Sequence, residues 1–250
     1  MEEKILKNQI EDLINKAKNK GNSATKFLTP SQLLEAKNFI NYNKYNDEVE
    51  IREEGGYFGA ERKRLVFINK DWGSSDRGAL IIAIQIEHRK KDIIGHRDIL
   101  GALMNMGIER NTIGDIETKN QHPTLVCLPE IGQYLIDNLK KIGNIGVNLK
   151  YIDIEELGTR IEELEEELLI TSSMRVDCLV AEIYKISRNQ ALIMVQQGKI
   201  IHNHVVVVKQ DDIIKEGDTI TLRGAGKVKI LAKEGLTKKD RVKIKIGRYI

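Results

Sequence analysis

The most informative stretch of the sequence is Met174-Arg-Val-Asp-Cys-Leu-Val-Ala-Glu-Ile183, which is followed closely by Ser187-Arg-Asn-Gln190. In the first segment the spacing of one helical face brings together Val176, Leu179, Val180 and Ile183. The second segment is a capping box, in which the Ser would cap a new helix and the Gln side chain, three residues later, would hydrogen-bond back to the Ser amide. The sequence therefore predicts two short helices in succession.

A small sheet is predicted to follow these helices, with strands over Lys199–Ile201, Val205–Lys209, Thr219–Leu222 and Lys227–Leu231. Arg175 precedes the first helix and Arg188 opens the second, where free backbone amides favour phosphate. Lys199, Arg223 and Lys227 come from the strand edges. Packing of the two helices could bring these cations together on one rim, where guanidinium groups suit phosphate oxygens.

The charge of the chain is divided unevenly. Residues 174–250 hold 16 Lys and Arg against 8 Asp and Glu, whereas residues 1–173 hold 24 against 29. Cations that neutralise phosphates release condensed counterions, so this division indicates a C-terminal end that binds a polyanion. A solvated basic face would explain the charge equally well. The acid-rich stretch from Asp153 to Glu167 is interpreted as a linker or an exposed helix.

Several spaced motifs of the C-terminal region resemble the S4-type RNA-binding domain. They are Arg175-x-Asp177, Ser187-Arg188, Gln197-Gly198-Lys199-Ile200, Asn203 and Gly217-Asp218-x-Ile220. That family grips structured RNA around its two-helix start, so the resemblance implies contacts by Arg175, Ser187, Arg188, Gln190, Gln197, Lys199 and Asn203. We expect Arg175 and Arg188 to contribute most and Asp177 to orient Arg175. Asn203 could instead be a purely structural turn residue.

Motifs further upstream extend the resemblance to the YlmH family over nearly the whole chain. They are Gly55-Gly-Tyr-Phe-Gly-Ala-Glu-Arg-Lys-Arg64, His96-Arg-Asp-Ile-Leu-Gly101, Gly107-Ile-x-Arg110 and Gly114-Asp-Ile116. Arg223-Gly-x-Gly226 is similar too, although Lys227 stands where that family often has Arg. The resemblance implies a ribosome-associated factor that binds the large subunit carrying a stalled peptidyl-tRNA, in translation quality control.

The middle of the chain predicts a β-α-β-β-α-β order, with strands at 79–87, 113–117, 124–128 and 147–152 and helices at 96–106 and 129–142. This is the ferredoxin-like order of many RNA-recognition domains. Such domains stack bases on aromatic residues of their central strands. Neither 79–87 nor 124–128 contains Phe, Tyr or Trp. We therefore expect this domain to be a scaffold or a protein-contact module.

A second candidate RNA contact is Glu61-Arg-Lys-Arg64, which follows a glycine-rich turn. The alternation of a strand would place Arg62 and Arg64 on one face and Lys63 on the other. A solvated edge strand is an equally good interpretation.

Composition and motifs argue against several other classes. The chain is 41% hydrophobic and 31% charged with 3 Pro, which is typical of a globular protein. Cys127 and Cys178 lie too far apart for a C-x-x-C site and fit a reducing cytoplasm. The longest apolar run, Ala79–Ile84, is too short to span a membrane.

Neither a catalytic group nor a metal site is predicted, because His88 and His96 have no ligand spacing with a nearby Cys or acid. Gly224-Ala-Gly-Lys227 fails as a phosphate-binding loop, because Val228 replaces the magnesium-binding Ser or Thr. We expect no cofactor and no small-molecule substrate. The predicted function is non-enzymatic binding of ribosomal RNA or tRNA. An RNA-modifying enzyme with an appended S4-like domain and a protein adaptor tethered to RNA are the alternatives.

The expected fold is α+β, in five segments. They are an N-terminal α+β domain (1–76), a ferredoxin-like domain (77–153), an acidic linker (154–173), an S4-like domain (174–231) and a basic tail (232–250).

Overall fold

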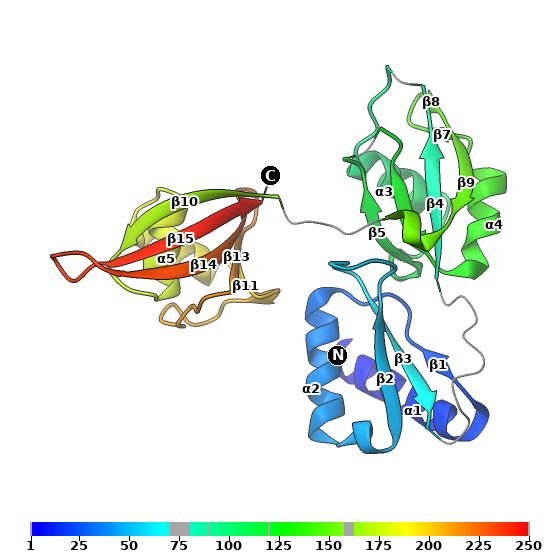
Figure 1. Cartoon of the computed structure of the whole chain (residues 1–250), viewed down its shortest axis with the longest axis horizontal. Helices are drawn as coiled ribbons and strands as arrows, with labels where there is room; N and C mark the ends of the chain where they lie inside the picture. The colour runs from blue at the N-terminus through cyan, green and yellow to red at the C-terminus, as the bar shows by residue number, and fades with distance from the viewer. Residues whose placement is uncertain (1, 71–80, 90, 120, 158–162, 250) are drawn as a thin grey trace. The chain divides into compact units, whose positions relative to one another are not determined.

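The computed structural model describes residues 2–70, 81–89, 91–119, 121–157 and 163–249. The chain divides into two compact units, Met1–Arg160 and Ile161–Ile250 (Figure 1). Both units combine helices with sheets, so the predicted mixed character of the fold is confirmed.

The first part of the N-terminal unit is a three-stranded antiparallel sheet covered by two helices. Its elements are α1 (Glu2–Lys20), β1 (Ser23–Ala24), α2 (Pro30–Tyr42), the 3-10 helix η1 (Tyr45–Asp47), β2 (Val49–Glu54) and β3 (Arg64–Asn69), with strand order β1-β3-β2. Ile10 and Ile14 of α1 pack with Ala36 of α2 and Phe67 of β3 in one buried core. The apolar residues of α1 recur every three or four positions, which gives the helix this buried face.

The second part of this unit is a four-stranded antiparallel sheet of order β5-β6-β4-β9. Its elements are β4 (Ile82–Glu87), α3 (His96–Asn105), η2 (Arg110–Thr112), β5 (Ile113–Glu117), β6 (Thr124–Cys127), α4 (Pro129–Asn138), β7 (Lys141–Ile142), β8 (Ile145–Gly146), β9 (Asn148–Ile152) and η3 (Ile154–Leu157). Ile99 of α3 and Leu135 of α4 share one core with Ile84 of β4, so both helices cover the same face of the sheet. The main elements follow the expected β-α-β-β-α-β order, although α4 ends four residues before the predicted helix end at 142.

A small cluster of buried side chains joins the two parts of the N-terminal unit. Phe27, from the segment after β1, packs with Ile81, Val126 and Leu128 of the four-stranded sheet and its flanks. A Cβ atom at Gly114 would lie 2.8 Å from Cε1 of Phe27, so glycine is required for this close approach.

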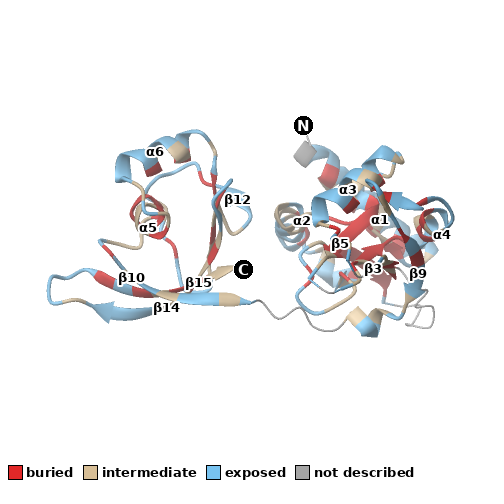
Figure 2. Ribbon diagram, turned by 90° about the horizontal axis from the view of Figure 1, so that it is seen from above, coloured by how far each residue is buried: buried red, intermediate tan, exposed pale blue. Residues whose placement is uncertain are grey.

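The C-terminal unit is a six-stranded sheet of order β10-β15-β14-β13-β11-β12, with two helices on one face. Its elements are β10 (Leu164–Thr171), α5 (Val176–Ile183), α6 (Arg188–Gln196), β11 (Ile200–His202), β12 (Val205–Val206), β13 (Thr219–Leu222), β14 (Gly226–Leu236) and β15 (Val242–Tyr249). Buried residues gather between the helices and the strands in Figure 2. The two predicted helices are therefore present, with a sheet after them.

Two expectations for this unit were wrong. The acidic segment was expected to be a linker or an exposed helix. Its second half, Leu164–Thr171, is instead a strand that pairs along its whole length with β15. The expected basic tail is the β14–β15 hairpin, in which Val242, Ile244 and Ile246 are buried. Apolar and charged residues alternate in this hairpin, so one side of each strand completes the core and the other carries the charges.

Candidate nucleic-acid interface

Two helix starts lie at the centre of the candidate site. Arg175 is the N-cap residue of α5, and Ser187 is the N-cap residue of α6. The Gln190 amide N–H donates to Ser187 Oγ at 3.2 Å, and Gln190 Oε1 accepts from the Ser187 amide at 2.9 Å. The predicted capping box is therefore confirmed, and it fixes Arg188 at the first position of α6.

Both arginines bind the same carboxylate. Arg175 Nε and Nη2 donate to the two oxygens of Asp177 at 3.0 and 3.1 Å. Arg188 donates to Asp177 Oδ2 from Nε at 2.9 Å and from Nη2 at 2.7 Å. The Asp177 side chain is 1% exposed, whereas those of Arg175 and Arg188 are 35% and 55% exposed. The two guanidinium groups thus converge over one buried acid while keeping part of their surface in solvent.

The pair of arginines controls the ionisation of Asp177. Burial acts to raise the pKa of this carboxyl, but hydrogen bonds and charge from Arg175 and Arg188 outweigh it and hold the pKa below its ordinary value. Asp177 is therefore ionised at neutral pH, and the three side chains together carry a single net positive charge. A shallow cavity of about 410 Å³ beside them is lined by residues that include Cys178, Lys185 and Arg188.

The other predicted contacts of the C-terminal unit lie elsewhere. Gln197 and Lys199 are exposed at the end of α6, so the length of this nine-residue helix, about 13 Å, separates them from Arg188. The Arg223 amide donates to the Lys199 carbonyl at 3.0 Å, which brings these two exposed cations together. The cations predicted to share one rim therefore form two separate groups: Arg175 and Arg188 near the start of α6, and Lys199 with Arg223 beyond its end.

Asn203 and Lys227 have defined partners in the structure. Asn203 has a φ of +45°, its Nδ2 donates to Asp218 at 2.6 Å, and its Oδ1 accepts from the Thr219 amide at 2.8 Å. It therefore holds a turn in place. Lys227 Nζ lies 4.5 Å from the centre of the Tyr249 ring, on the side of the sheet away from the helices.

The guanidinium groups of the N-terminal candidates Arg62 and Arg64 donate hydrogen bonds to backbone carbonyls. Arg62 donates to the carbonyls of Phe27 and Ile113, and Arg64, which is 9% exposed, donates to that of Thr25 at 2.7 Å. Burial, helped by the nearby charge of Arg110, lowers the pKa of Arg62 to about 10. Lys63 pairs with Glu53 at 3.0 Å. These groups join chain segments within the unit.

Asp115, which the sequence did not single out, organises that junction. It is 8% exposed and accepts hydrogen bonds from Tyr57 Oη, the Glu61 amide and the Arg62 amide at 2.7, 2.7 and 3.0 Å. The only sequence signal was its place in the Gly114-Asp-Ile116 motif. A single carboxylate therefore ties the loop before β3 to strand β5.

Among the residues that the structure describes, no group of three or more His, Cys, Asp or Glu could hold a metal ion. No helix in that part of the chain is long and apolar enough to cross a membrane.

Comparison with known proteins finds a family model similar to the four-stranded domain. Residues 78–156 match the family model described as "Putative RNA-binding domain in YlmH". This description names RNA binding for a domain that we expected to be a scaffold or protein-contact module, and that expectation stays a prediction.

Similarity to known proteins extends beyond this domain. "Ribosome-associated protein quality control protein P2" of Bacillus subtilis (strain 168) is 29% identical over 202 residues, which cover 80% of this chain and 79% of that protein. The fold resembles that of "Cell division protein ylmH from Streptococcus pneumoniae", with a TM-score of 0.51 at 23% identity over 62% of this chain and 94% of that chain. The resemblance of this chain to the YlmH family, which the sequence motifs predicted, is confirmed.

Proposed function

We propose that this protein binds structured RNA without catalysing a reaction, and that Arg175 and Arg188 are its principal phosphate contacts. The observation that carries the proposal is their geometry: two exposed guanidinium groups are held over Asp177 at neighbouring helix starts. Each group is oriented by its hydrogen bonds to the acid, and helix starts favour anions. In this proposal residues 174–231 act as an S4-like module.

The partner in this proposal is ribosomal RNA, with tRNA, on the large subunit in the cytoplasm. The name of the Bacillus subtilis relative supports a role on the ribosome in quality control of interrupted synthesis. The family description supports a second contact by the four-stranded domain. Ser187, Gln190, Gln197, Lys199 and Arg223 would add contacts along α6, whereas Arg62 and Arg64 are left out because backbone carbonyls occupy them.

Arg188→Ala tests the proposal with little disturbance of the fold, because Arg175 still pairs with Asp177. We expect the affinity for isolated large ribosomal subunits to fall about tenfold, as for a lost charged hydrogen bond at an interface. Filter binding at several salt concentrations measures this change.

Arg52→Ala is the matched control, since Arg52 is also a partly exposed arginine paired with an acid, Glu50. It removes the same charge from the N-terminal unit and should leave the affinity unchanged. Equal binding by wild type and Arg188→Ala would refute the proposed contact. Loss of a protein partner with unchanged RNA binding would favour the adaptor alternative.

A further inference from the structure

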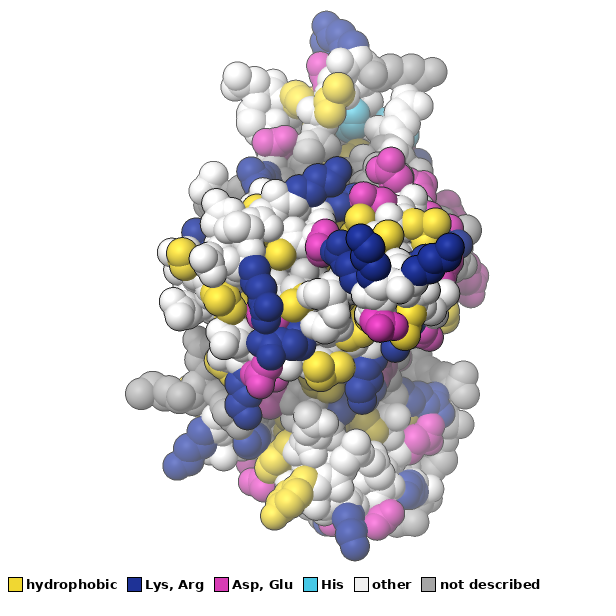
Figure 3. All heavy atoms as spheres, turned by 90° about the vertical axis from the view of Figure 1, so that its left-hand side faces the viewer, with side chains coloured by type: hydrophobic (Ala, Val, Ile, Leu, Met, Phe, Trp, Pro, Cys, Tyr) yellow, Lys and Arg dark blue, Asp and Glu magenta, His cyan; other side chains and the backbone are white. Residues whose placement is uncertain are grey.

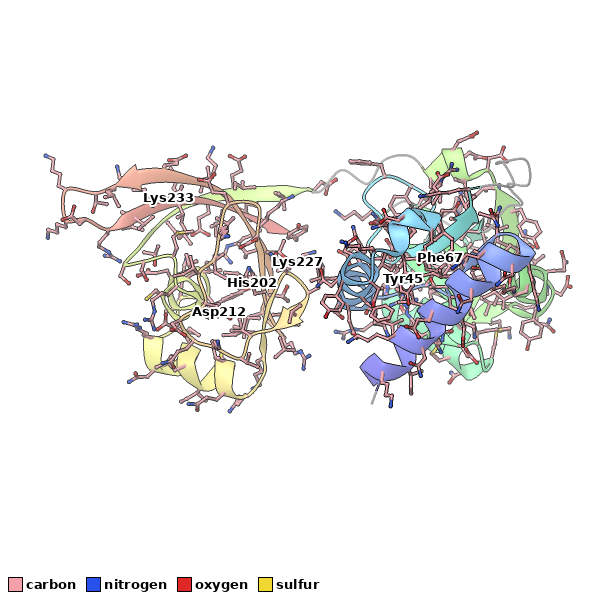
Figure 4. The ribbon with its side chains drawn as sticks, turned by 90° about the horizontal axis from the view of Figure 1, so that it is seen from below. Tyr45, Phe67, His202, Asp212, Lys227 and Lys233 are labelled. Atoms are coloured by element: carbon pink, nitrogen blue, oxygen red, sulfur yellow. The ribbon has the colours of Figure 1, made fainter. Side chains whose placement is uncertain are left out.

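One phenylalanine of the N-terminal unit lies in solvent. Phe58, in the loop between β2 and β3, is 82% exposed, whereas Phe27 and Phe67 are buried. Phe67 packs with residues of α1 in the interior of the unit (Figure 4). Single exposed apolar side chains are ordinary on protein surfaces, and Figure 3 shows several among the charged residues of the C-terminal unit. Exposure alone therefore assigns no role to Phe58, but its loop is unusual.

The loop that carries Phe58 is held on both sides of the ring. Tyr57 Oη donates to Asp115 Oδ2 at 2.7 Å, and the Ala60 amide donates to the Tyr57 carbonyl at 3.3 Å. Ala60 is buried, and a Cβ atom on Gly55 would lie 2.4 Å from the Cβ atom of Ala60. The backbone on either side of Phe58 is therefore anchored, while the ring itself is left in water.

This loop lies on the face of the four-stranded sheet opposite to α3 and α4. Leu125 and Cys127 of β6 belong to the core shared with these helices, so Val126 between them points to the other face. A Cβ atom on Gly56 would lie 3.2 Å from Cγ2 of Val126, and Tyr57 packs against the cluster that contains this valine. The loop can be followed in Figure 1, at the end of β2 and β3 nearest to the four-stranded domain. Phe58, the next residue along the chain, lies at the border of this face.

The strands contribute no aromatic side chain to this face. The residues of β4, β5 and β6 include no Phe, Tyr or Trp. Strand β9 contains Tyr151, but its ring lies against α4, because a Cβ atom on Gly132 would be 3.2 Å from Tyr151 Cε1. RNA-recognition domains stack unpaired bases on aromatic rings of such a sheet face. The loop between β2 and β3 thus supplies the aromatic ring that the strands lack.

We infer that Phe58 stacks on an unpaired base of the RNA at the border of the four-stranded sheet. The inference rests on the proposed function and adds a contact to a base, since Arg175 and Arg188 are assigned to phosphates. The flat face of one base can be covered by a single ring, whereas a protein partner would need a wider surface, of about 800 Å² on each side. Gly59, beside Phe58, offers no side chain for such a surface. Every base has a flat face, so the contact is expected to tolerate changes of RNA sequence.

The structural roles of Arg62 and Arg64 support this assignment. Their hydrogen bonds to backbone carbonyls tie the segment after the loop to both parts of the N-terminal unit. A ring on an anchored loop loses little freedom when a base stacks on it. The glycine-rich motif that ends in these arginines therefore positions Phe58 and does not itself bind phosphate.

Phe58→Ala tests the inference, with deproteinised RNA of the large ribosomal subunit as the probe in filter binding. We expect about tenfold weaker binding, which is typical of one stacked base. The slope of log affinity against log salt should keep its wild-type value, because no phosphate contact is lost. Phe58→Trp should keep the wild-type affinity, since it retains an aromatic face. Phe58→Leu, which is apolar but has no ring, should bind as weakly as Phe58→Ala.

Tyr42→Ala is the matched control. Tyr42 is the last residue of α2 and is 87% exposed, so the variant also removes an exposed aromatic ring from the N-terminal unit. It should keep the wild-type affinity and slope. Arg188→Ala, in contrast, should lower both the affinity and the slope, because it removes a phosphate contact.

Four results contradict the inference in distinguishable ways. If wild type binds the RNA and Phe58→Ala binds it equally well, Phe58 is not an RNA contact, while the proposed function stands. If Phe58→Leu keeps the wild-type affinity, the contact is apolar packing and stacking is refuted. If Phe58→Ala binds the RNA normally but intact subunits more weakly, the ring meets a ribosomal protein and the inference is overturned. If wild type itself does not bind the RNA, the proposed function fails and the inference fails with it.

Discussion

Asp115→Ala is expected to destabilise the N-terminal unit by about 3–5 kcal/mol. Asp115 is buried and accepts hydrogen bonds from two backbone amides and the Tyr57 hydroxyl. Each hydrogen bond to a charged group contributes about 1.5–3 kcal/mol, and a buried donor left without an acceptor costs about 1–3 kcal/mol. The variant also removes the acid that offsets the neighbouring charges of Arg62 and Arg110.

Urea unfolding measures this loss, and the reporter should belong to the N-terminal unit, such as hydrogen exchange of the β3 amides. Glu109→Ala is the control, because Glu109 is an exposed acid paired with Lys26 and such surface pairs contribute little. An unchanged unfolding midpoint for Asp115→Ala would show that the junction does not depend on this carboxylate. Binding through the C-terminal unit should survive in conditions where the variant remains folded.

The double variant Arg175→Ala with Arg188→Ala is expected to lose RNA binding and also to weaken the fold of the C-terminal unit. Both arginine partners of Asp177 disappear, and its carboxylate remains at a buried position with the Cys178 amide still donating to it. Stranding a buried charge typically costs about 3–5 kcal/mol. Water can follow the truncated side chains to Asp177, so we expect about 2–3 kcal/mol.

The pH dependence distinguishes this mechanism from a general loss of packing. In the wild type the pKa of Asp177 is lowered, so its contribution to stability is present above the unfolded-state pKa and disappears as pH falls through the folded-state value. In the double variant the two guanidinium groups no longer oppose the effect of burial, which should raise this pKa, so the penalty exists at neutral pH and is relieved on acidification. The two stabilities should therefore approach each other below about pH 4.

A triple variant that adds Asp177→Ala separates stability from binding. Without the acid no buried charge is stranded, so most of the lost stability should return. RNA binding should not return, because both guanidinium groups are still missing. If the triple variant were as unstable as the double variant, the cost would lie in packing around α5 and not in the Asp177 charge.

The sequence predicted the features that depend on local spacing. The capping box at Ser187, the apolar face of α5 and the element order of the four-stranded domain all have periods that can be read within a few residues. The convergence of Arg175 and Arg188 followed from the same local signals, since each lies at a helix start. The sharing of one acid did not, because Asp177 and Arg188 are eleven residues apart.

The two wrong expectations concern charged segments that turned out to be strands. The segment Leu164–Thr171 is rich in glutamate and was interpreted as linker or exposed helix, yet it pairs with β15 on the edge of the sheet. On the other strand, Val242, Ile244 and Ile246 alternate with lysines, which is a strand signal in a segment expected to be a tail. Opposite charges on the two strands, as in Glu167 with Arg248, favour this pairing.

The structural roles of Arg62 and Arg64 depend on contacts between distant segments. Their acceptors are the carbonyls of Phe27, Ile113 and Thr25, which lie far away in the sequence and become neighbours only in the folded unit. No local pattern distinguishes an arginine that joins chain segments from one that is available to bind a ligand.

One carboxylate restrains both Arg175 and Arg188. These long side chains therefore lose conformational entropy when the unit folds, before any ligand binds. A rigid pair of guanidinium groups then loses little further freedom on association, which raises affinity without additional contacts. The same restraint makes the distance between the two groups a criterion of selection. If the pair binds RNA as proposed, an anion whose oxygens match that distance would fit, whereas a polyanion with a different spacing would first have to break the bonds to Asp177.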